Sequence, residues 1–345
     1  MGIIDDFRDA GDGLGHHPQD HGWRSLYRLF SYGLNNSAPN LTSSIHTYHQ
    51  ARPTLSPTHM LTLLGIALKV VAPESFEQIS ADSPAEGRLL TLEGILYKHG
   101  QEIAAIVNRR QNSFTAARRF LLPQVLLSAY FSARPEHDAI FADLGTGLGI
   151  LPRQLDSRQQ YEQFARDLIW PNGTPAFREI SLRTRLGVDR GPLPDLSWVH
   201  ACYGSSQYYA RLYDELLDVL HAPDVTDCNA SFEELDILNL DALDEFICRH
   251  HVNVANLSYV LYELDKRKRA AVIELIIARL QPPGLLMVSE PHQELHGQGT
   301  VVELYHEGNP KPRTICFVSD GHFKGHVIPL DDYDQFTTEH PIAYE

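Results

Sequence analysis

The spacing of apolar residues changes about one third of the way along the 345-residue chain. Up to about residue 125, the apolar positions follow helix-like patterns, and proline-rich stretches such as "ARPTLSPTH" separate them. Beyond that point, short apolar runs alternate with amphipathic segments, which is typical of a parallel sheet covered by helices. We therefore expect a helical amino-terminal region, 1–125, followed by an α/β domain, 126–345.

Apolar runs of strand length predict a doubly wound, Rossmann-like sheet in the second part of the chain. The predicted strands are 139–145, 184–189, 234–238, 252–258 and 285–291. Between the last two, "DKRKRAAVIELIIARLQPPG" has an apolar helical face and ends in prolines and a glycine, which predicts a strand, helix, strand unit. The runs "TVVELYHE" and "RTICFVSD", joined by "GNPKP", predict a closing antiparallel hairpin.

The charge of the chain restricts its possible partners. A formal net charge of -15 argues against a protein that mainly grips a phosphate backbone, because that affinity comes from Lys and Arg displacing counterions. Nucleic acid is therefore not an expected partner. One basic cluster, 108–119, is expected to be a solvated helix face or to pair with acids. Because the start of the chain lacks a secretory signal and the longest apolar segment, 60–71, is too short for a bilayer, we expect a cytoplasmic protein without a membrane partner.

The metal-binding residue types do not form a recognisable metal motif. The four cysteines are far apart, which is typical of reduced thiols and not of zinc sites. His322 and His326 are four residues apart, but Gly321 and Gly325 disfavour the helix that would bring them to one face. We therefore predict no metal site.

The stretch "FADLGTGLGI", 141–150, holds the most informative pattern in the chain. Three glycines at alternate positions, 145, 147 and 149, follow an apolar run that contains Asp143. In a doubly wound sheet the ligand lies at such a strand-to-helix turn, where glycines let the backbone bend and a ligand approach. The spacing GxGxG differs from the GxGxxG that binds a dinucleotide. A tight turn without a ligand is the alternative interpretation.

This pattern resembles the first motif of class I S-adenosylmethionine-dependent methyltransferases, whose glycine loop wraps the methionine part of the cofactor. The resemblance implies a Rossmann-like methyltransferase fold and S-adenosylmethionine as cofactor. The residues that it assigns to the cofactor here are Asp143, Gly145, Thr146, Gly147 and Gly149.

Two acids farther along fit the same family. Asp189 ends the second predicted strand, where the family places an acid on the ribose hydroxyls, and a carboxylate can accept two hydrogen bonds side by side. The alternative is an Asp that caps the following turn. Asp189 follows Gly149 by 40 residues, against roughly 20 in a simple βαβ unit, so an insertion is expected at about 151–183. Asp236 and Ile237 resemble the adenine-binding position.

The segment "VANLSYVLYELDKRKRAAVIELIIARLQPPGLLMVSEP" resembles the fourth and fifth strands of many class I methyltransferases. Residues after the fourth strand face the methyl group in that family, which implies that Asn256 touches the cofactor and that Ser258, Tyr259 and Glu263 are catalytic candidates. A hydroxyl or protonated amine acceptor needs a base. The other candidates for it near strand ends are Glu290 and His292. Capping, core packing or an ordinary polar loop is the alternative for each of them.

A narrower resemblance covers most of the chain. The segment "RLGVDRGPLPDLSWVHACYGSSQYYARLYDELLDVL", with the helical first part, is similar to a bacterial methyltransferase-like family of unknown function. Members of it often lack the acid before the glycine loop, whereas Asp143 is present here. The family implies no substrate. We expect a small-molecule acceptor or a protein side chain. The acidic chain and the aromatic-rich insertion favour the small molecule, because they suit an enclosed, neutral or weakly cationic ligand better than a polyanion.

Three alternatives remain open from the sequence. A non-catalytic binding or scaffold protein of the same fold would retain the glycine loop without methyl transfer. A nicotinamide dehydrogenase is disfavoured by the missing GxGxxG. A nucleic-acid methyltransferase is suggested by the likeness of "NLSY" to an Asn-Pro-Pro-Tyr motif, but both prolines are absent. The sequence predicts no particular oligomeric state.

Overall fold

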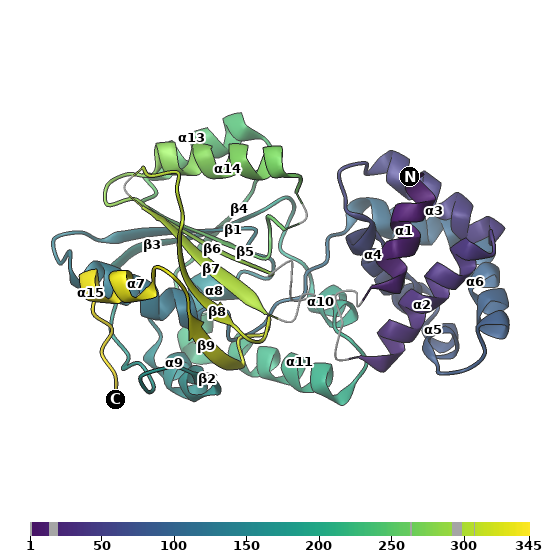
Figure 1. The fold of residues 1–345 in the computed structure, drawn as a ribbon, viewed down its shortest axis with the longest axis horizontal. Coiled ribbons are helices and arrows are strands. Elements are labelled where there is room, and N and C mark those ends of the chain that lie inside the picture. The colour runs from purple at the N-terminus through teal and green to yellow at the C-terminus, as the bar shows by residue number, and fades with distance from the viewer. Residues whose placement is uncertain (1, 14–19, 263, 292–298, 307) are drawn as a thin grey trace. The chain divides into compact units, whose positions relative to one another are not determined.

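The computed structural model describes residues 2–13, 20–262, 264–291, 299–306 and 308–345 (Figure 1). The chain divides into two compact units, a helical unit of residues 1–114 and 195–214 and an α/β unit of residues 115–194 and 215–345. This division differs from the predicted boundary at residue 125 in two ways. The segment 115–125 belongs to the α/β unit, and the segment 195–214 leaves the α/β domain to join the helical unit.

The helical unit is built from amphipathic helices that bury their apolar faces against one another. Its helices are α1 (Ile3–Asp12), α2 (His21–Asn35), α3 (Pro39–Ala51), α4 (Pro57–Val71), α5 (Pro73–Ser80), α6 (Ala85–Arg109) and α10 (Leu196–Cys202), with the first part of α11 (Gln207–Leu220). Trp23 on α2 is fully buried. A Cβ at Gly65 would lie 2.4 Å from the Trp23 ring, so α4 can pass this indole only with a glycine.

Hydrogen bonds explain why the segment 195–214 packs with helices that are remote in sequence. The buried carboxylate of Asp20 caps α2 by accepting from the Trp23 amide at 3.0 Å, and it also accepts from the Ser206 amide at 2.7 Å. The Trp198 indole donates to the Gln111 carbonyl at 2.9 Å, and its ring joins the apolar core of the helical unit. These are long-range contacts, which a local pattern of apolar residues does not encode.

A single sheet organises the α/β unit. Within the described residues its strand order is β2-β9-β8-β7-β6-β5-β1-β3-β4. The strands are β1 (Ala139–Leu144), β2 (Leu168–Ile169), β3 (Leu182–Asp189), β4 (Ser231–Glu234), β5 (Val254–Ser258), β6 (Leu285–Pro291), β7 (Thr300–His306), β8 (Arg313–Val318) and β9 (Gly325–Pro329). Strands β4, β3, β1, β5 and β6 are parallel, whereas β7, β8 and β9 continue the sheet in antiparallel pairings. The α/β class and the closing hairpin of β7 and β8 are confirmed.

Four of the five predicted strands correspond to β1, β3, β5 and β6. The prediction of a strand at 234–238 is wrong, because β4 pairs with β3 only over Ser231–Glu234. The chain then leaves the sheet: the Leu235 amide donates to the Asp189 carbonyl at 2.7 Å, and the Asp236 side chain accepts from the Leu238 amide at 3.0 Å. The strands β2 and β9, which pair with each other, were not predicted.

Helices cover both faces of the sheet (Figure 1). On one face, α13 (Leu240–His250) and α14 (Lys266–Arg279) pack on residues such as Ala142 and Leu257. On the other face, α7 (Leu121–Ser132) packs on residues such as Phe141 and Met287. The remaining helices of this unit are α8 (Ile150–Gln154), α9 (Arg158–Phe164), η1 (Ala165–Asp167), the rest of α11, α12 (Pro223–Thr226) and α15 (Tyr333–Glu339).

The aromatic residues of the segment 151–183 are packing residues. Tyr161, Phe164 and Trp170 are buried in the core that α7 shares with the sheet, and Phe177 packs against that core. The alternative interpretation, a lid or substrate wall, is therefore not supported by their positions. This segment also supplies β2 at the edge of the sheet.

Candidate functional site

The glycine loop between β1 and α8 has a backbone that only glycine adopts readily. Gly145, Gly147 and Gly149 have φ angles of +85°, +57° and +72°, in the left-handed region. A Cβ at Gly145 would lie 2.5 Å from the Val260 side chain, and one at Gly149 would lie 2.4 Å from the Phe232 ring. The loop is thus constrained both by its conformation and by its neighbours.

Asp143 lies at the end of β1 under this loop, with 4% of its surface exposed. Its Oδ2 accepts a hydrogen bond from the Thr146 hydroxyl at 2.8 Å, and its Oδ1 accepts one from Asn256 Nδ2 at 2.8 Å. Burial raises the pKa of Asp143 to about 6, although these two hydrogen bonds oppose the increase. At neutral pH the loop therefore covers a buried negative charge.

Asp189, at the end of β3, is bonded directly to the glycine loop. Its Oδ2 accepts from the Gly147 amide at 2.8 Å and its Oδ1 from the Arg190 amide at 2.7 Å. Burial raises the pKa of this carboxyl group as well. Each carboxylate oxygen can accept a further hydrogen bond, so the group can stabilise its turn and still bind two ligand hydroxyls. The two interpretations of Asp189 from the sequence are compatible.

Asp236 follows β4 and is linked to Asp189 through one intervening residue. Arg190, whose amide bonds to Asp189, also pairs with Asp236, with 3.3 Å between Arg190 Nε and Asp236 Oδ2. The neighbouring Ile237 is buried in the apolar core on the α13 and α14 face of the sheet. The acids at the ends of β1, β3 and β4 therefore lie along one edge of the parallel part of the sheet.

The end of β5 contributes two buried polar atoms without partners. Asn256 is fully buried, and its Oδ1 has no hydrogen-bond partner among the described residues. The same holds for Ser258 Oγ within the part of the chain that the structure describes. Asn256 Nδ2 donates to a carboxylate, which can only accept, so the orientation of the side-chain amide is fixed. Asn256 Oδ1 is therefore the atom that is left to accept a hydrogen bond from a ligand. An unsatisfied buried acceptor costs about 1 to 3 kcal/mol, which a ligand donor can recover.

Tyr259 turns the chain at the end of β5. Its φ of +58° is unusual for a residue with a side chain, and its amide donates to the Ser289 carbonyl at 2.9 Å. Its hydroxyl is hydrogen-bonded to Thr300 Oγ1 at 2.5 Å. Burial raises the pKa of this phenol. Tyr259 is thus held in place as a neutral group at neutral pH.

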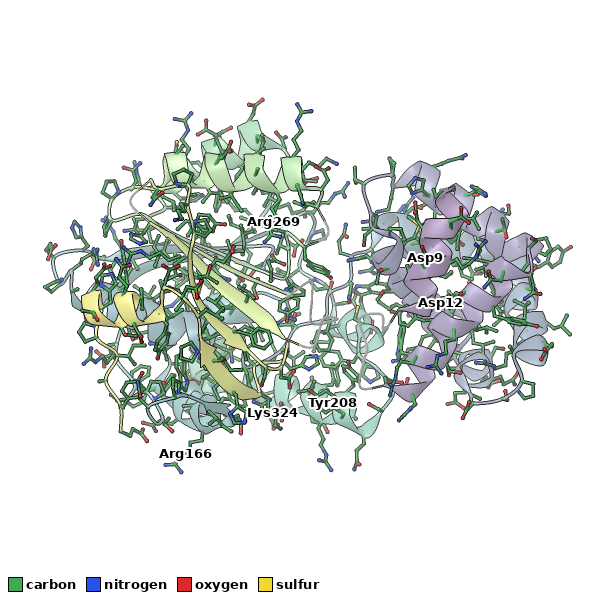
Figure 2. The ribbon with its side chains drawn as sticks, in the orientation of Figure 1. Asp9, Asp12, Arg166, Tyr208, Arg269 and Lys324 are labelled. Carbon is green, nitrogen blue, oxygen red and sulfur yellow. The ribbon has the colours of Figure 1, made fainter. Side chains whose placement is uncertain are left out.

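Glu290, a candidate base, instead holds the loop after β5. Its Oε1 accepts from the amides of Val260 and Leu261 at 3.0 and 2.7 Å, and its Oε2 accepts from the Tyr262 amide at 3.1 Å. Burial raises the pKa of Glu290 to about 7, opposed by these amides and by the charge of Arg269 on α14, which Figure 2 labels. The carboxylate orders the loop and is not placed as a base. The candidates Glu263 and His292 lie outside the described residues.

Arg119 is a residue of this region that the sequence analysis missed. Its guanidinium carbon lies 4.2 Å from the centre of the Tyr259 ring, and its positive charge opposes the burial-induced rise in the pKa of both Tyr259 and Asp143. Thr115, four residues earlier, lies beside the glycine loop: its Oγ1 is 3.2 Å from where a Cβ on Gly147 would be. The segment 115–119 therefore runs along the site.

The basic cluster 108–119 thus differs from the expected solvated helix face. Helix α6 ends at Arg109, so the rest of the cluster lies beyond it. Arg118 does pair with acids, Asp167 and Glu215, but is itself only 4% exposed. The sequence holds one local indication that this cluster is not a solvated helix face: it directly precedes the apolar helix α7, which packs on the sheet.

Among the described residues, no group of three or more His, Cys, Asp or Glu side chains is arranged to hold a metal ion. Within the same residues, no helix combines the length and apolar character needed to cross a membrane.

Comparisons with known proteins give little further information. No family model matches the chain, and a search of curated proteins returns no match. Among solved structures, the chain is similar to the crystal structure of a S-adenosylmethionine-dependent methyltransferase from Clostridium acetobutylicum ATCC 824. The two share 9% sequence identity, with a TM-score of 0.24, over 63% of this chain and 80% of that chain. At these values the similarity supports no conclusion about activity, so function is inferred from the site alone.

Proposed function

We propose that this chain binds S-adenosylmethionine at the carboxyl ends of β1, β3 and β5 and transfers its methyl group to a small molecule. One observation carries the proposal: the left-handed glycine loop is tied to acids on two neighbouring strands. It covers Asp143, which Thr146 and Asn256 hold, and it donates its Gly147 amide to Asp189. A turn that only joined β1 to α8 would not need a buried carboxylate, whose desolvation is costly.

The residues fit the parts of this cofactor. Asp189 is partly exposed and can accept from the two ribose hydroxyls. Asp236 lies at the same edge of the sheet as Asp189 and can accept a hydrogen bond from an exocyclic amine. Ile237 is its apolar neighbour. Asn256 Oδ1, buried and without a partner among the described residues, suits a donor on the ligand. The glycine loop lets a ligand approach its backbone at Gly147 without a Cβ between them.

The catalytic contribution expected of the chain is mainly positioning. When bound, the sulfonium of S-adenosylmethionine supplies an activated methyl group. In-line transfer then depends on holding the acceptor in the right geometry. Ser258 and Tyr259 end the strand beside the site and are the described candidates for contacting an acceptor, with Glu263 as a further candidate. The net charge of -15 favours a small neutral or weakly cationic acceptor over a polyanion.

Calorimetric titration with S-adenosylmethionine and S-adenosylhomocysteine tests the proposal. We expect binding on the micromolar scale, about -8 kcal/mol, for the unmodified chain. Gly147→Ala should abolish most of it, because a side chain at this φ shifts the loop that carries the Gly147 amide. Gly308→Ala is the matched control: Gly308 has a similar φ of +69° in the turn between β7 and β8, with open space around it. Both variants carry the strain of a side chain on a left-handed backbone, and only Gly147→Ala also places a Cβ 3.2 Å from Thr115 Oγ1 beside the site.

Asp189→Asn provides a second test of the same site. It removes the negative charge but keeps the shape, and it should weaken both ligands at least about 10-fold, as loss of hydrogen bonds to a charged group does. Equal affinity in Asp189→Asn and the unmodified chain would remove Asp189 from the site.

Cofactor binding without methyl transfer is a second candidate. It is favoured because both described candidates for a base are engaged within the protein, Glu290 by three loop amides and Tyr259 by Thr300. A chain that binds both ligands, but releases no S-adenosylhomocysteine above the uncatalysed rate with any of a panel of hydroxyl, amine and thiol acceptors, would support this candidate over methyl transfer.

A further inference from the structure

Three consecutive amides after β5 converge on one carboxylate. Glu290 Oε1 accepts hydrogen bonds from the Val260 and Leu261 amides at 3.0 and 2.7 Å, and Glu290 Oε2 accepts one from the Tyr262 amide at 3.1 Å. Glu290 is buried, with 4% of its surface exposed. An ionised carboxylate accepts on both oxygens, whereas a protonated carboxyl group must direct a hydrogen from one of them. The ionised form therefore holds these three amides best.

The loop 260–262 that Glu290 holds reaches the glycine loop through Val260. A Cβ on Gly145 would lie 2.5 Å from Val260 Cγ2, so the Val260 side chain fills the space beside the Gly145 backbone. The next residue, Leu261, is fully buried in the apolar core that α13 and α14 form with the sheet. A change in the position of the loop 260–262 therefore moves Val260 relative to the first glycine of the candidate site.

The charge of Glu290 changes near neutral pH. Burial raises its pKa to about 7, opposed by the three loop amides and by the charge of Arg269 on α14. The end of β5 places the Tyr259 phenol near this carboxyl group, and burial raises the pKa of that phenol, so it stays neutral. On β7, the residue paired with Glu290 is the apolar Val301. Of these groups, Glu290 is the one whose charge changes between pH 6 and pH 8.

We infer that Glu290 is a positioning residue of the cofactor site: its ionised carboxylate holds the loop 260–262 where Val260 supports the glycine loop at Gly145, and ligand affinity falls when that charge is lost. This inference rests on the proposed function, because the ligand is the cofactor proposed above. It makes protonation of Glu290 a control on the site. Glu290 does not have to touch the ligand for this effect, since it acts through Val260.

Calorimetric titration with S-adenosylhomocysteine at pH 8 and pH 6 tests the inference on the unmodified chain and on Glu290→Gln. Gln keeps the size of the side chain and one acceptor oxygen but carries no charge at either pH. Glu303→Gln is the matched control, because Glu303 lies on the neighbouring strand β7 and accepts from the Tyr305 hydroxyl. The raised pKa values of Asp143 and Asp189 affect all three proteins alike, so their effects cancel in a ratio of affinities.

We expect Glu290→Gln to weaken S-adenosylhomocysteine about 10-fold at pH 8, the effect of replacing a charged hydrogen-bond acceptor by a neutral one. At pH 6 most of the unmodified chain is protonated at Glu290, so the two affinities should differ only about 2-fold. Glu303→Gln should bind like the unmodified chain at both pH values. A merely structural defect would lower the affinity by the same factor at pH 8 and pH 6, and that result would overturn the inference.

The route through Val260 is tested by a double-mutant cycle. Val260→Ala removes the side chain beside Gly145 but keeps the three amides, and it should itself weaken S-adenosylhomocysteine. Adding Glu290→Gln to Val260→Ala should then weaken binding by less than about 2-fold at pH 8, against about 10-fold in the unmodified chain. Full additivity of the two losses would overturn the inference.

Hydrogen exchange of the ligand-free chain separates this inference from the proposed function. The amides of Val260, Leu261 and Tyr262 should exchange about 10-fold faster in Glu290→Gln than in the unmodified chain at pH 8, because the loop then opens more often. Equal exchange in the two proteins would overturn the inference and leave the proposed function intact. If the amides respond as expected but the unmodified chain binds no S-adenosylhomocysteine, the proposed function fails, and the inference about the site fails with it.

Discussion

The buried charge of Asp143, which belongs to the candidate site, is predicted to lower the free energy of unfolding. The carboxyl group is buried, and its pKa is raised from the ordinary 3.8 to about 6. Burial therefore disfavours the ionised form by about two pKa units, or about 3 kcal/mol at 1.36 kcal/mol per unit. Asn at this position keeps the size of the side chain and can still bond to Asn256 and Thr146, because the Thr hydroxyl can accept as well as donate. Asp143→Asn should therefore stabilise the chain at neutral pH.

The pH dependence follows from proton linkage. Between pH 4 and pH 6 the folded chain binds more protons at Asp143 than the unfolded chain does, so this group makes stability fall as pH rises through that window. The Asn side chain does not titrate. The gain in free energy of unfolding from Asp143→Asn should thus be near zero at pH 4, grow through pH 6 and level off near about 3 kcal/mol above pH 7.

Urea denaturation between pH 4 and pH 8 measures this effect, with β1 and β5 followed by pulsed hydrogen exchange so that the α/β unit is observed separately. Asp244→Asn is the control, because it removes a partly exposed charge paired with Arg279 and should change stability by less than about 1 kcal/mol. The same Asp143→Asn variant should bind S-adenosylhomocysteine more weakly, since its site lacks the buried charge. A variant that is less stable than the unmodified chain at pH 7.5, or a difference that does not change with pH, would refute the reasoning.

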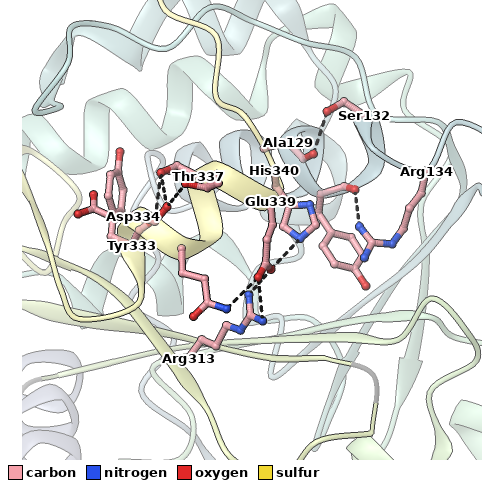
Figure 3. Close-up of polar contacts among 12 residues, drawn as sticks. Ala129, Ser132, Arg134, Arg313, Tyr333, Asp334, Thr337, Glu339 and His340 are labelled. Carbon is pink, nitrogen blue, oxygen red and sulfur yellow. Dashed lines mark hydrogen bonds and ion pairs between the residues drawn. The ribbon is translucent and has the colours of Figure 1, made fainter.

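Two further predictions concern groups outside the site. Arg118→Met breaks the buried ion pairs of Arg118 with Asp167 and Glu215 and should lower the free energy of unfolding by about 2 to 3 kcal/mol. This loss is below the usual cost for fully buried pairs because both carboxylates retain some exposure. Denaturation with urea measures it, and a loss below about 1 kcal/mol would contradict the prediction. His340 packs between the rings of Tyr130 and Phe336, at 5.1 and 5.0 Å, and burial lowers its pKa to about 4. Figure 3 shows His340 beside Glu339, with 4.0 Å between His340 Nε2 and Glu339 Oε2. Because the unfolded chain binds the proton more readily, stability should fall as pH drops from 6.5 to 4, and His340→Phe should remove that part of the pH dependence in thermal denaturation; an unchanged pH profile would contradict this.

The sequence predicts the parallel part of the sheet because those strands are short apolar runs. Strands β1, β3, β5 and β6 are flanked by strands on both sides and covered by helices, so their own residues carry the signal. Strand β4 lies at the edge and reads "SFEE", without an apolar run, and its extent is set by pairing with β3. The apolar residues that suggested a strand at 234–238 are instead core residues of the following turn, such as Ile237.

The part of the candidate site that depends on local backbone conformation was predictable from the sequence. The glycine positions and Asp143 follow from the turn itself, and the left-handed φ angles explain why glycine is needed there. Arg119 was not predictable, because its contact with Tyr259 joins residues 140 positions apart, and local spacing does not encode such a contact. For the same reason, the engagement of Glu290 with the loop after β5 appears only in three dimensions.

The most direct measurement of the central claim is a calorimetric titration of the unmodified chain with S-adenosylhomocysteine, with NAD as the competing class of nucleotide ligand. We expect saturable binding of S-adenosylhomocysteine with a dissociation constant on the order of micromolar and no binding of NAD. Binding of NAD in its place, or no binding of S-adenosylhomocysteine at millimolar concentration, would contradict the assignment of the glycine loop, Asp143 and Asp189 to this cofactor.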